Sequence, residues 1–246
     1  MSRADVMPRP QPAPSLLEQV RGLIERTYDH RTGLGPLAPY VIGDEGLRLL
    51  TARGNAVERV RALAPPGRDG ASLPPQLLVR FGPEGGVRAS LYLPDRLIHT
   101  LERHPPDRAL HAENVDAFAG LIEEIDHLLL LAARVRGGPP LTLLEMELHA
   151  NVTKELVLRH YAARLAGLRA LPSDVVEWIR YHLFRKPRFC DPDPLVRARY
   201  QDAARFGMRF LRLIDELHSF YLRLACLRRF SRMSHQQKIQ LVQSAS

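Results

Sequence analysis

Hydrophobic residues alternate with polar ones over residues 77–93 and recur every three or four residues after residue 94. In the first segment, Leu77 and Val79 lie on one face of an extended chain, and Val87, Ala89 and Leu91 repeat the alternation after a PEGG turn. A period of two is typical of strands, so the pattern predicts a β-hairpin over residues 77–93. A lone hairpin is marginally stable in water, so we expect it to pair with a strand near residues 40–42 or to lie on a helix.

The pattern after residue 94 is helical to the end of the chain. We expect helices over residues 94–103, 111–136, 141–166, 173–185, 194–230 and 234–244. Two of them flank the short turn GGPP at 137–140, so they should be antiparallel neighbours. Asp193 followed by Pro194 is a typical helix start.

The region before the hairpin contains a shorter helical signal. Ser15 and Glu18 form a capping-box pattern at the start of a helix expected to reach about residue 28. One or two short helices should follow within residues 43–64, whereas residues 1–14 are rich in proline and should form a disordered tail. Removing this tail should leave the melting temperature unchanged. The sequence therefore predicts a predominantly α, α+β fold with a tail at 1–14, an N-terminal α/β subdomain at 15–93 and a helical bundle at 94–246.

The amino-acid composition limits which binding partners and which cellular compartment we expect for the protein. The formal charge is +8, yet nearly all the basic residues are arginines, and the lysines are Lys154, Lys186 and Lys238. This bias suggests a GC-rich genome, so the total charge says less about partners than the distribution of the arginines does. The cysteines, Cys190 and Cys226, are too few and too far apart for a zinc motif or a disulfide scaffold. With no signal peptide and no apolar run of about 20 residues, we expect a cytoplasmic protein without a membrane segment.

The stretch GLIEEIDHLLLL, residues 120–131, places ionisable groups where a helix becomes apolar all round. Glu123 and His127 lie four residues apart, and the next helix repeats this spacing with Glu145 and His149. In an antiparallel pair folded near residue 138, the two histidines would lie almost level, flanked by the two glutamates. Histidine and carboxylate side chains are ligands for zinc, iron and manganese, so these four residues form a candidate metal site.

A helical wheel offers a second interpretation of the same residues. The buried stripe of the first helix contains Phe118, Ile122 and Ile125, which places Glu123 and His127 on the opposite face, toward solvent. In the second helix, Glu147 and Lys154 should also face solvent. The four residues would then be a structural polar cluster or part of a solvated surface.

Two further features lie in the C-terminal helices. Arg205, Arg209, Arg212 and Arg223 should share the exposed face of one long helix, with Arg228, Arg229, Arg232 and Lys238 beyond it. Such a face could follow nucleic-acid phosphates, but no DNA-binding motif accompanies it. His218 should border the core of the same helix and could complete a site with His127 and His149.

No nucleophile elbow, phosphate-binding loop or dinucleotide-binding motif occurs in the chain. We therefore expect a cytoplasmic binding or regulatory protein that acts on a protein partner through helical surfaces, without catalysis. The first alternative is a metal-dependent enzyme or metal-binding protein that uses the Glu/His seam. The second is a nucleic-acid-associated protein that uses the arginine face.

Overall fold

The computed structural model describes residues 14–52, 73–81, 86–187 and 193–244. The protein is predominantly helical, with a small sheet near its N-terminus, as the predicted α+β class requires. The predicted tail and most of the segment 43–64 lie outside the described residues, which include only α2 (Asp44–Ala52) from that segment.

The sheet has three strands in the order β1-β3-β2. Strands β2 (Gln76–Phe81) and β3 (Val87–Tyr92) form the predicted antiparallel hairpin, with Leu77 opposite Leu91. Strand β1 (Val41–Ile42) follows the 3₁₀ turn η1 (Ala38–Tyr40) and pairs in parallel with β3. The expected third strand near residues 40–42 is confirmed.

Helices account for the remaining elements. They are α1 (Leu16–Tyr28), α3 (Asp95–Arg103), α4 (Val115–Val135), α5 (Leu143–Ala166), α6 (Ser173–Arg180), the π-helical turn η2 (Tyr181–Arg185), α7 (Pro194–Glu216), α8 (Phe220–Arg232) and α9 (His235–Ser244). No strand occurs in the described part of residues 111–230, as predicted. The change from strands to helices falls at residue 94, and the division into two subdomains there stays a prediction.

Two helix starts follow the sequence signals. The Ser15 hydroxyl accepts a hydrogen bond from the backbone N–H of Glu18. The Glu18 carboxylate does not complete the capping box, because it accepts from the N–H of Leu37 at 2.6 Å and so fixes the loop after α1. Asp193 caps α7 by accepting from the N–H of Leu195 at 2.8 Å.

The prediction of a single helix over residues 194–230 is wrong, because the segment forms two helices. The chain leaves α7 at Leu217, whose backbone is extended (φ −74°, ψ 115°), and α8 begins at Phe220. Arg223 of α8 donates to the carbonyl oxygens of Leu217 and Asp215, at 2.5 and 3.4 Å. These bonds satisfy carbonyls that the end of α7 leaves without helical partners.

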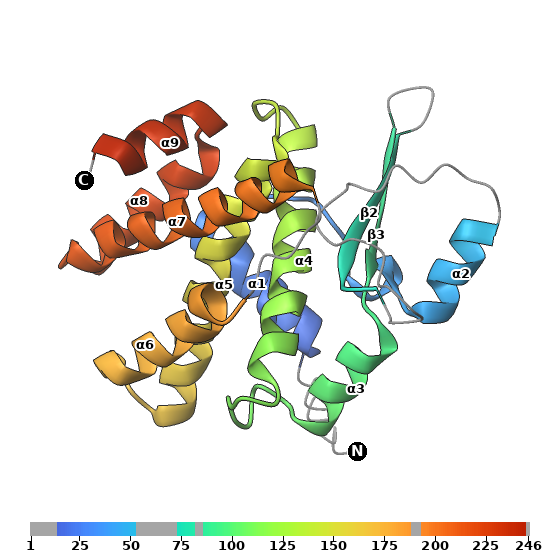
Figure 1. Cartoon of the computed structure of the whole chain (residues 1–246), viewed down its shortest axis with the longest axis horizontal. Coiled ribbons are helices and arrows are strands. Elements are labelled where there is room, and N and C mark those ends of the chain that lie inside the picture. The colour runs from blue at the N-terminus through green and yellow to red at the C-terminus, as the bar shows by residue number, and fades with distance from the viewer. Residues whose placement is uncertain (1–13, 53–72, 82–85, 188–192, 245–246) are drawn as a thin grey trace, which may run out of the picture.

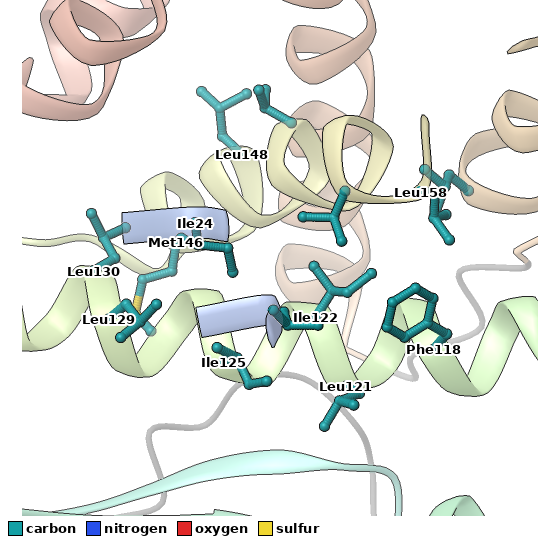
Figure 2. Close-up of a cluster of buried hydrophobic side chains, with 14 of the residues drawn as sticks. Ile24, Phe118, Leu121, Ile122, Ile125, Leu129, Leu130, Met146, Leu148 and Leu158 are labelled. Carbon is teal, nitrogen blue, oxygen red and sulfur yellow. The ribbon is translucent and has the colours of Figure 1, made fainter. Parts of the chain in front are cut away.

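Helix α4 occupies the centre of the fold, with the sheet and α3 on one side and α5 on the other (Figure 1). Helix α1 packs against α4, α5 and α8, and α7 packs along α5. The approach of α7 is close at Gly207, where an added Cβ would lie 3.2 Å from the Cβ of Asn151. The stripe predicted for α4 forms the middle of the core, where Ile24 of α1 and Met146, Leu148 and Leu158 of α5 meet Phe118, Ile122 and Ile125 (Figure 2).

Candidate functional site

The α4/α5 pair brings most of the candidate residues together. Its helices are antiparallel, because Phe118 contacts Tyr161 at one end (4.8 Å between ring centroids) and Arg134 contacts Glu145 at the other (2.5 Å). Gly137 at φ 119° allows the tight turn between them, since side chains disfavour this conformation. Thr142 starts α5 by accepting from the N–H of Glu145.

The seam between α4 and α5 buries an unusual number of ionisable groups. His127, Glu145 and His149 are completely buried. The solvent-facing interpretation is therefore wrong for His127, and also for Glu147, of which 3% is exposed. The physical reason is that α4 lies between the sheet and α5, while α7 covers α5, so neither helix keeps a fully solvated face there.

The first group is the glutamate cluster, which we define as Glu123, Glu124, His127 and Glu147. Glu123, His127 and Glu147 each offer a ligand atom, and these three atoms lie within 4.8 Å of one another. Glu124 Oε2 lies 3.5 Å from His127 Nδ1, and Lys154 donates to Glu123 at 2.6 Å. Among the described residues, neither ring nitrogen of His127 has a hydrogen-bond partner, and neither does Glu147 Oε1.

Burial and neighbouring charges raise the pKa values of three groups in the glutamate cluster and lower that of the fourth, Glu123. Burial raises the pKa of Glu147 to about 8, and it raises that of Glu124 as well. Burial alone would lower the pKa of His127, but contact with Glu124 and the charges of Glu147 and Glu123 raise it to about 10. Burial also opposes ionisation of Glu123, yet the positive charge of Lys154 keeps its pKa below the ordinary value.

The second group is the histidine cluster, defined as Tyr28, Asp126, His149 and Thr153. Asp126 accepts from His149 Nδ1 at 2.8 Å and from the Thr153 hydroxyl, also at 2.8 Å. The Tyr28 hydroxyl lies 2.8 Å from that of Thr153. The Asp126 carboxylate therefore fixes the Nδ1–H tautomer of His149, whose buried Nε2 has no partner among the described residues. Burial lowers the pKa of His149, although the charge of Asp126 opposes the shift.

The third group is the Glu145 triad, made of Glu145, Arg134 and Lys238. Glu145 Oε1 accepts from Arg134 at 2.5 Å and from Lys238 at 2.6 Å. Arg134 also donates to the carbonyls of Ser231 and Met233. Lys238, which we expected on the basic surface, is completely buried, because this triad joins α9 to the start of α5.

The structure does not bring the four predicted metal ligands to one place. Glu123 and His127 meet Glu147, whereas Glu145 meets Arg134 and Lys238, and His149 meets Asp126. Glu123 and His127 share one group, whereas Glu145 and His149, also about one helical turn apart, have different partners. The two pairs lie on opposite flanks of the seam and do not form one set of ligands.

Several site residues escaped the sequence reasoning, although the sequence does contain signals for them. Glu124 precedes His127 by three residues, which is the Glu-x-x-His spacing found in metal-binding helical bundles. Thr153 follows His149 by four residues, so it lies on the same face of α5. Nothing in the sequence pairs Asp126 with His149, because that contact depends on how the two helices are rotated against each other.

The remaining predicted residues lie apart from these groups. His218 is exposed in the connection between α7 and α8 and does not border the core, because α7 ends before it. Arg205, Arg209 and Arg212 are exposed along α7, as predicted, whereas Arg223 is half-buried. A partly exposed group of possible ligands, His104, His111 and Glu113, precedes α4.

Comparisons with known proteins do not add to this picture. A scan against family models and searches of the curated proteins and of the solved structures give no match. Among the described residues, no helix combines the length and the apolar character needed to cross a membrane.

Proposed function

We propose that the protein binds one divalent transition-metal ion in the glutamate cluster, through Glu123, His127 and Glu147. The observation that carries this proposal is the imidazole of His127, which is completely buried and has no hydrogen-bond partner for either nitrogen among the described residues. Buried polar groups without partners are rare and destabilising. A cation within reach of two carboxylates and this ring would satisfy all three side chains.

The donor atoms indicate which ions fit. Carboxylate oxygens combined with one imidazole nitrogen suit zinc, manganese or iron, and no thiolate contributes here. Glu124 lies beside His127 Nδ1, where this third carboxylate can orient the ring and leave Nε2 for the metal. Three protein ligands leave a coordination position for water or a substrate, so the metal-dependent enzyme expected as an alternative remains compatible with this site.

Lys154 lies where the site approaches solvent, and its ammonium group would compete with a metal ion for the Glu123 carboxylate. Its side chain is 12% exposed and that of Glu123 is 21% exposed, whereas the rest of the cluster is buried. An ion would therefore enter beside Lys154, whose ammonium group already neutralises Glu123 at 2.6 Å. Removing this positive charge should strengthen metal binding.

Elemental analysis of protein purified without a metal-affinity tag tests the proposal. We expect near-stoichiometric zinc, manganese or iron in the wild type, and its loss in His127→Ala and Glu147→Gln. His149→Ala is the matched control, since it removes a buried histidine from the same helix pair but from the other flank. Lys154→Met should retain the metal and bind it more tightly in a competition with chelator.

The outcomes separate the possible sites. Loss of the metal in both His127→Ala and His149→Ala would support the four-residue site predicted from the sequence over the glutamate cluster. A wild type that contains no transition metal, and whose melting temperature does not rise with added zinc, manganese or iron, would contradict a metal site of either kind.

A second proposed function, binding of a protein partner, is supported by the surface of α8. Phe220, Tyr221 and Leu222 at its start are 70%, 81% and 58% exposed. Beside them lies a groove of about 560 Å³, which is lined by Leu224, Ala225 and Met233 together with Arg228, Arg229 and Arg232. Among the residues that the structure describes, no acidic side chain lines this groove.

These features fit an acidic amphipathic helix of a partner protein, whose apolar side would cover Tyr221 and whose carboxylates would face the arginines. A cytoplasmic location would accord with this role. Fluorescence anisotropy should show binding of an acidic amphipathic peptide that Tyr221→Ala and Arg229→Glu weaken. Equal binding of a charge-reversed peptide would contradict the proposal.

A further inference from the structure

The connection between α3 and α4 (Figure 1) brings together three side chains that can bind a metal ion. His104 follows the last residue of α3, and His111 and Glu113 lie just before α4. Each offers a ligand atom, and the three atoms lie within 4.8 Å of one another. We define these three residues as the loop cluster. It shares no residue with the glutamate cluster, so an ion bound here would be independent of the proposed metal centre.

A buried asparagine holds both histidines of the loop cluster in place. Asn114 is completely buried, and its side-chain oxygen accepts from the backbone N–H of His111 at 3.0 Å. Its amide group donates to the carbonyl oxygens of His104 and Ala109, at 3.0 and 2.8 Å. These hydrogen bonds fix the backbone on both sides of the loop and leave the imidazole rings free to bind a ligand.

The distances within the loop cluster resemble those between metal ligands. Glu113 Oε2 lies 3.7 Å from His104 Nδ1 and 3.6 Å from His111 Nδ1. Direct hydrogen bonds between such atoms are shorter, at about 2.7–3.2 Å. Two ligands that each lie about 2.1 Å from a tetrahedral ion are about 3.4 Å apart. Small rotations of the three side chains would therefore place one ion among them.

The protonation of His111 favours a cation at this position. The backbone N–H of Glu113 donates to His111 Nδ1 at 3.4 Å, so this nitrogen carries the lone pair of the neutral ring. Two acceptors, His111 Nδ1 and Glu113 Oε2, then lie 3.6 Å apart without a proton between them. A metal ion would replace the long hydrogen bond and bind both acceptors.

The ligand set and its exposure indicate which ion fits. Two imidazole nitrogens with one carboxylate suit zinc, whereas magnesium and calcium prefer oxygen ligands alone. The side chains of His104, His111 and Glu113 are 30%, 37% and 71% exposed, so the ion and a water molecule can reach them from solvent. We infer that the loop cluster binds a zinc ion with water in the fourth position, and that this ion links the end of α3 to the start of α4.

Isothermal titration of zinc ions into the full chain, after dialysis against a chelator, tests the inference. The number of zinc equivalents should fall by one in His104→Ala and in His111→Ala, whether or not the glutamate cluster also binds an ion. Glu113→Gln keeps the size of the side chain but removes its charge. It should weaken binding by at least about tenfold, because loss of even a hydrogen-bond partner of a ligand costs about 10–100-fold in metal affinity.

His99→Ala is the matched control. His99 is an exposed histidine of α3 whose Nδ1 lies 3.6 Å from Glu102 Oε2, but this pair has no third ligand among the described residues. The variant should bind as many zinc ions as the wild type. Magnesium at equal concentration should not displace the zinc, because it does not favour imidazole ligands.

Two kinds of result would overturn the inference. Zinc binding that is lost in His127→Ala but unchanged in the double variant His104→Ala/His111→Ala would place the ion in the glutamate cluster alone. A wild type that binds no zinc, an equal loss in His99→Ala, or displacement by equimolar magnesium would show that the loop cluster is not a zinc site. Circular dichroism verifies that each variant is folded.

Discussion

Replacement of Glu145 by glutamine should be among the most destabilising changes that keep side-chain volume constant. The Glu145 and Lys238 side chains are completely buried, and Arg134 is nearly so. Glutamine retains an acceptor oxygen but removes the only negative charge of the triad. Arg134 keeps its bonds to the carbonyls of Ser231 and Met233, so Lys238 is the cation that is left without a counter-ion.

The expected loss of stability follows from this difference between Arg134, which keeps other hydrogen bonds, and Lys238, which loses its counter-ion. Removing one partner of a buried ion pair costs about 3–5 kcal/mol, because the other charge stays buried without compensation. Domains have a total stability of about 5–15 kcal/mol, so Glu145→Gln should shift the unfolding transition strongly. Lys238→Met should cost less than about 1 kcal/mol, since it leaves Glu145 paired with Arg134 and spares the desolvation of an ammonium group.

Urea unfolding followed by circular dichroism measures these differences, and a chelator in every sample removes any contribution of bound metal. The double variant Glu145→Gln/Lys238→Met should recover most of the stability lost in Glu145→Gln. The reasoning would be refuted if Glu145→Gln cost less than about 1 kcal/mol, or if Lys238→Met alone cost as much as Glu145→Gln.

Four further measurements test other parts of the structure. Burial lowers the pKa of Lys238 from 10.5 to about 8, so the unfolded chain binds more protons than the folded chain between these two pH values. The stability of the wild type relative to Lys238→Met should therefore rise with pH from about 8 to 10.5. A stability difference that does not change with pH would contradict this prediction. Phe210→Ala should cost about 3–5 kcal/mol in urea unfolding, because its buried ring stacks on Phe230 at 3.9 Å and no solvent reaches the space left behind. Arg232→Ala should change stability by less than about 0.5 kcal/mol in the same assay, because its ion pair with Asp29 is exposed on both sides. A random-sequence oligonucleotide should not bind at physiological salt, and salt-dependent binding that Arg209→Ala weakens would instead support the nucleic-acid alternative.

Much of the fold could be predicted from local patterns. Alternation over residues 77–93 identified the hairpin, and the GGPP turn identified an antiparallel helix pair, because both signals depend on residues close in sequence. The break between α7 and α8 was missed because no glycine or proline occurs near His218. Its cap comes from Arg223 of the following helix, and a side chain that binds backbone carbonyls leaves no periodic signal.

The candidate site was predictable only within single helices. Spacing showed that Glu123 and His127 share a face, and the structure keeps them in one cluster. Spacing could not show which elements enclose the two helices, since the sheet that packs on α4 and the helix α7 that packs on α5 come from distant parts of the chain. The prediction that Glu147 faces solvent failed for this reason.

The stretch EEIDH at residues 123–127 shows why periodicity alone could not assign partners here. Successive residues of a helix turn by about 100°, so polar side chains within five residues point in several directions. In a surface helix most of them would reach water, but α4 is enclosed, and each side chain instead meets a different neighbour. Glu123 meets Lys154, Asp126 meets His149, and His127 lies among glutamates. Asp126 binds His149 Nδ1, so one ring nitrogen of His149 has a hydrogen-bond partner, whereas neither ring nitrogen of His127 has one among the described residues. Incomplete satisfaction of buried groups is where ligand chemistry is expected. Two adjacent residues of one helix thus divide the seam into a flank that fixes the helices and a flank for which we propose a metal ion.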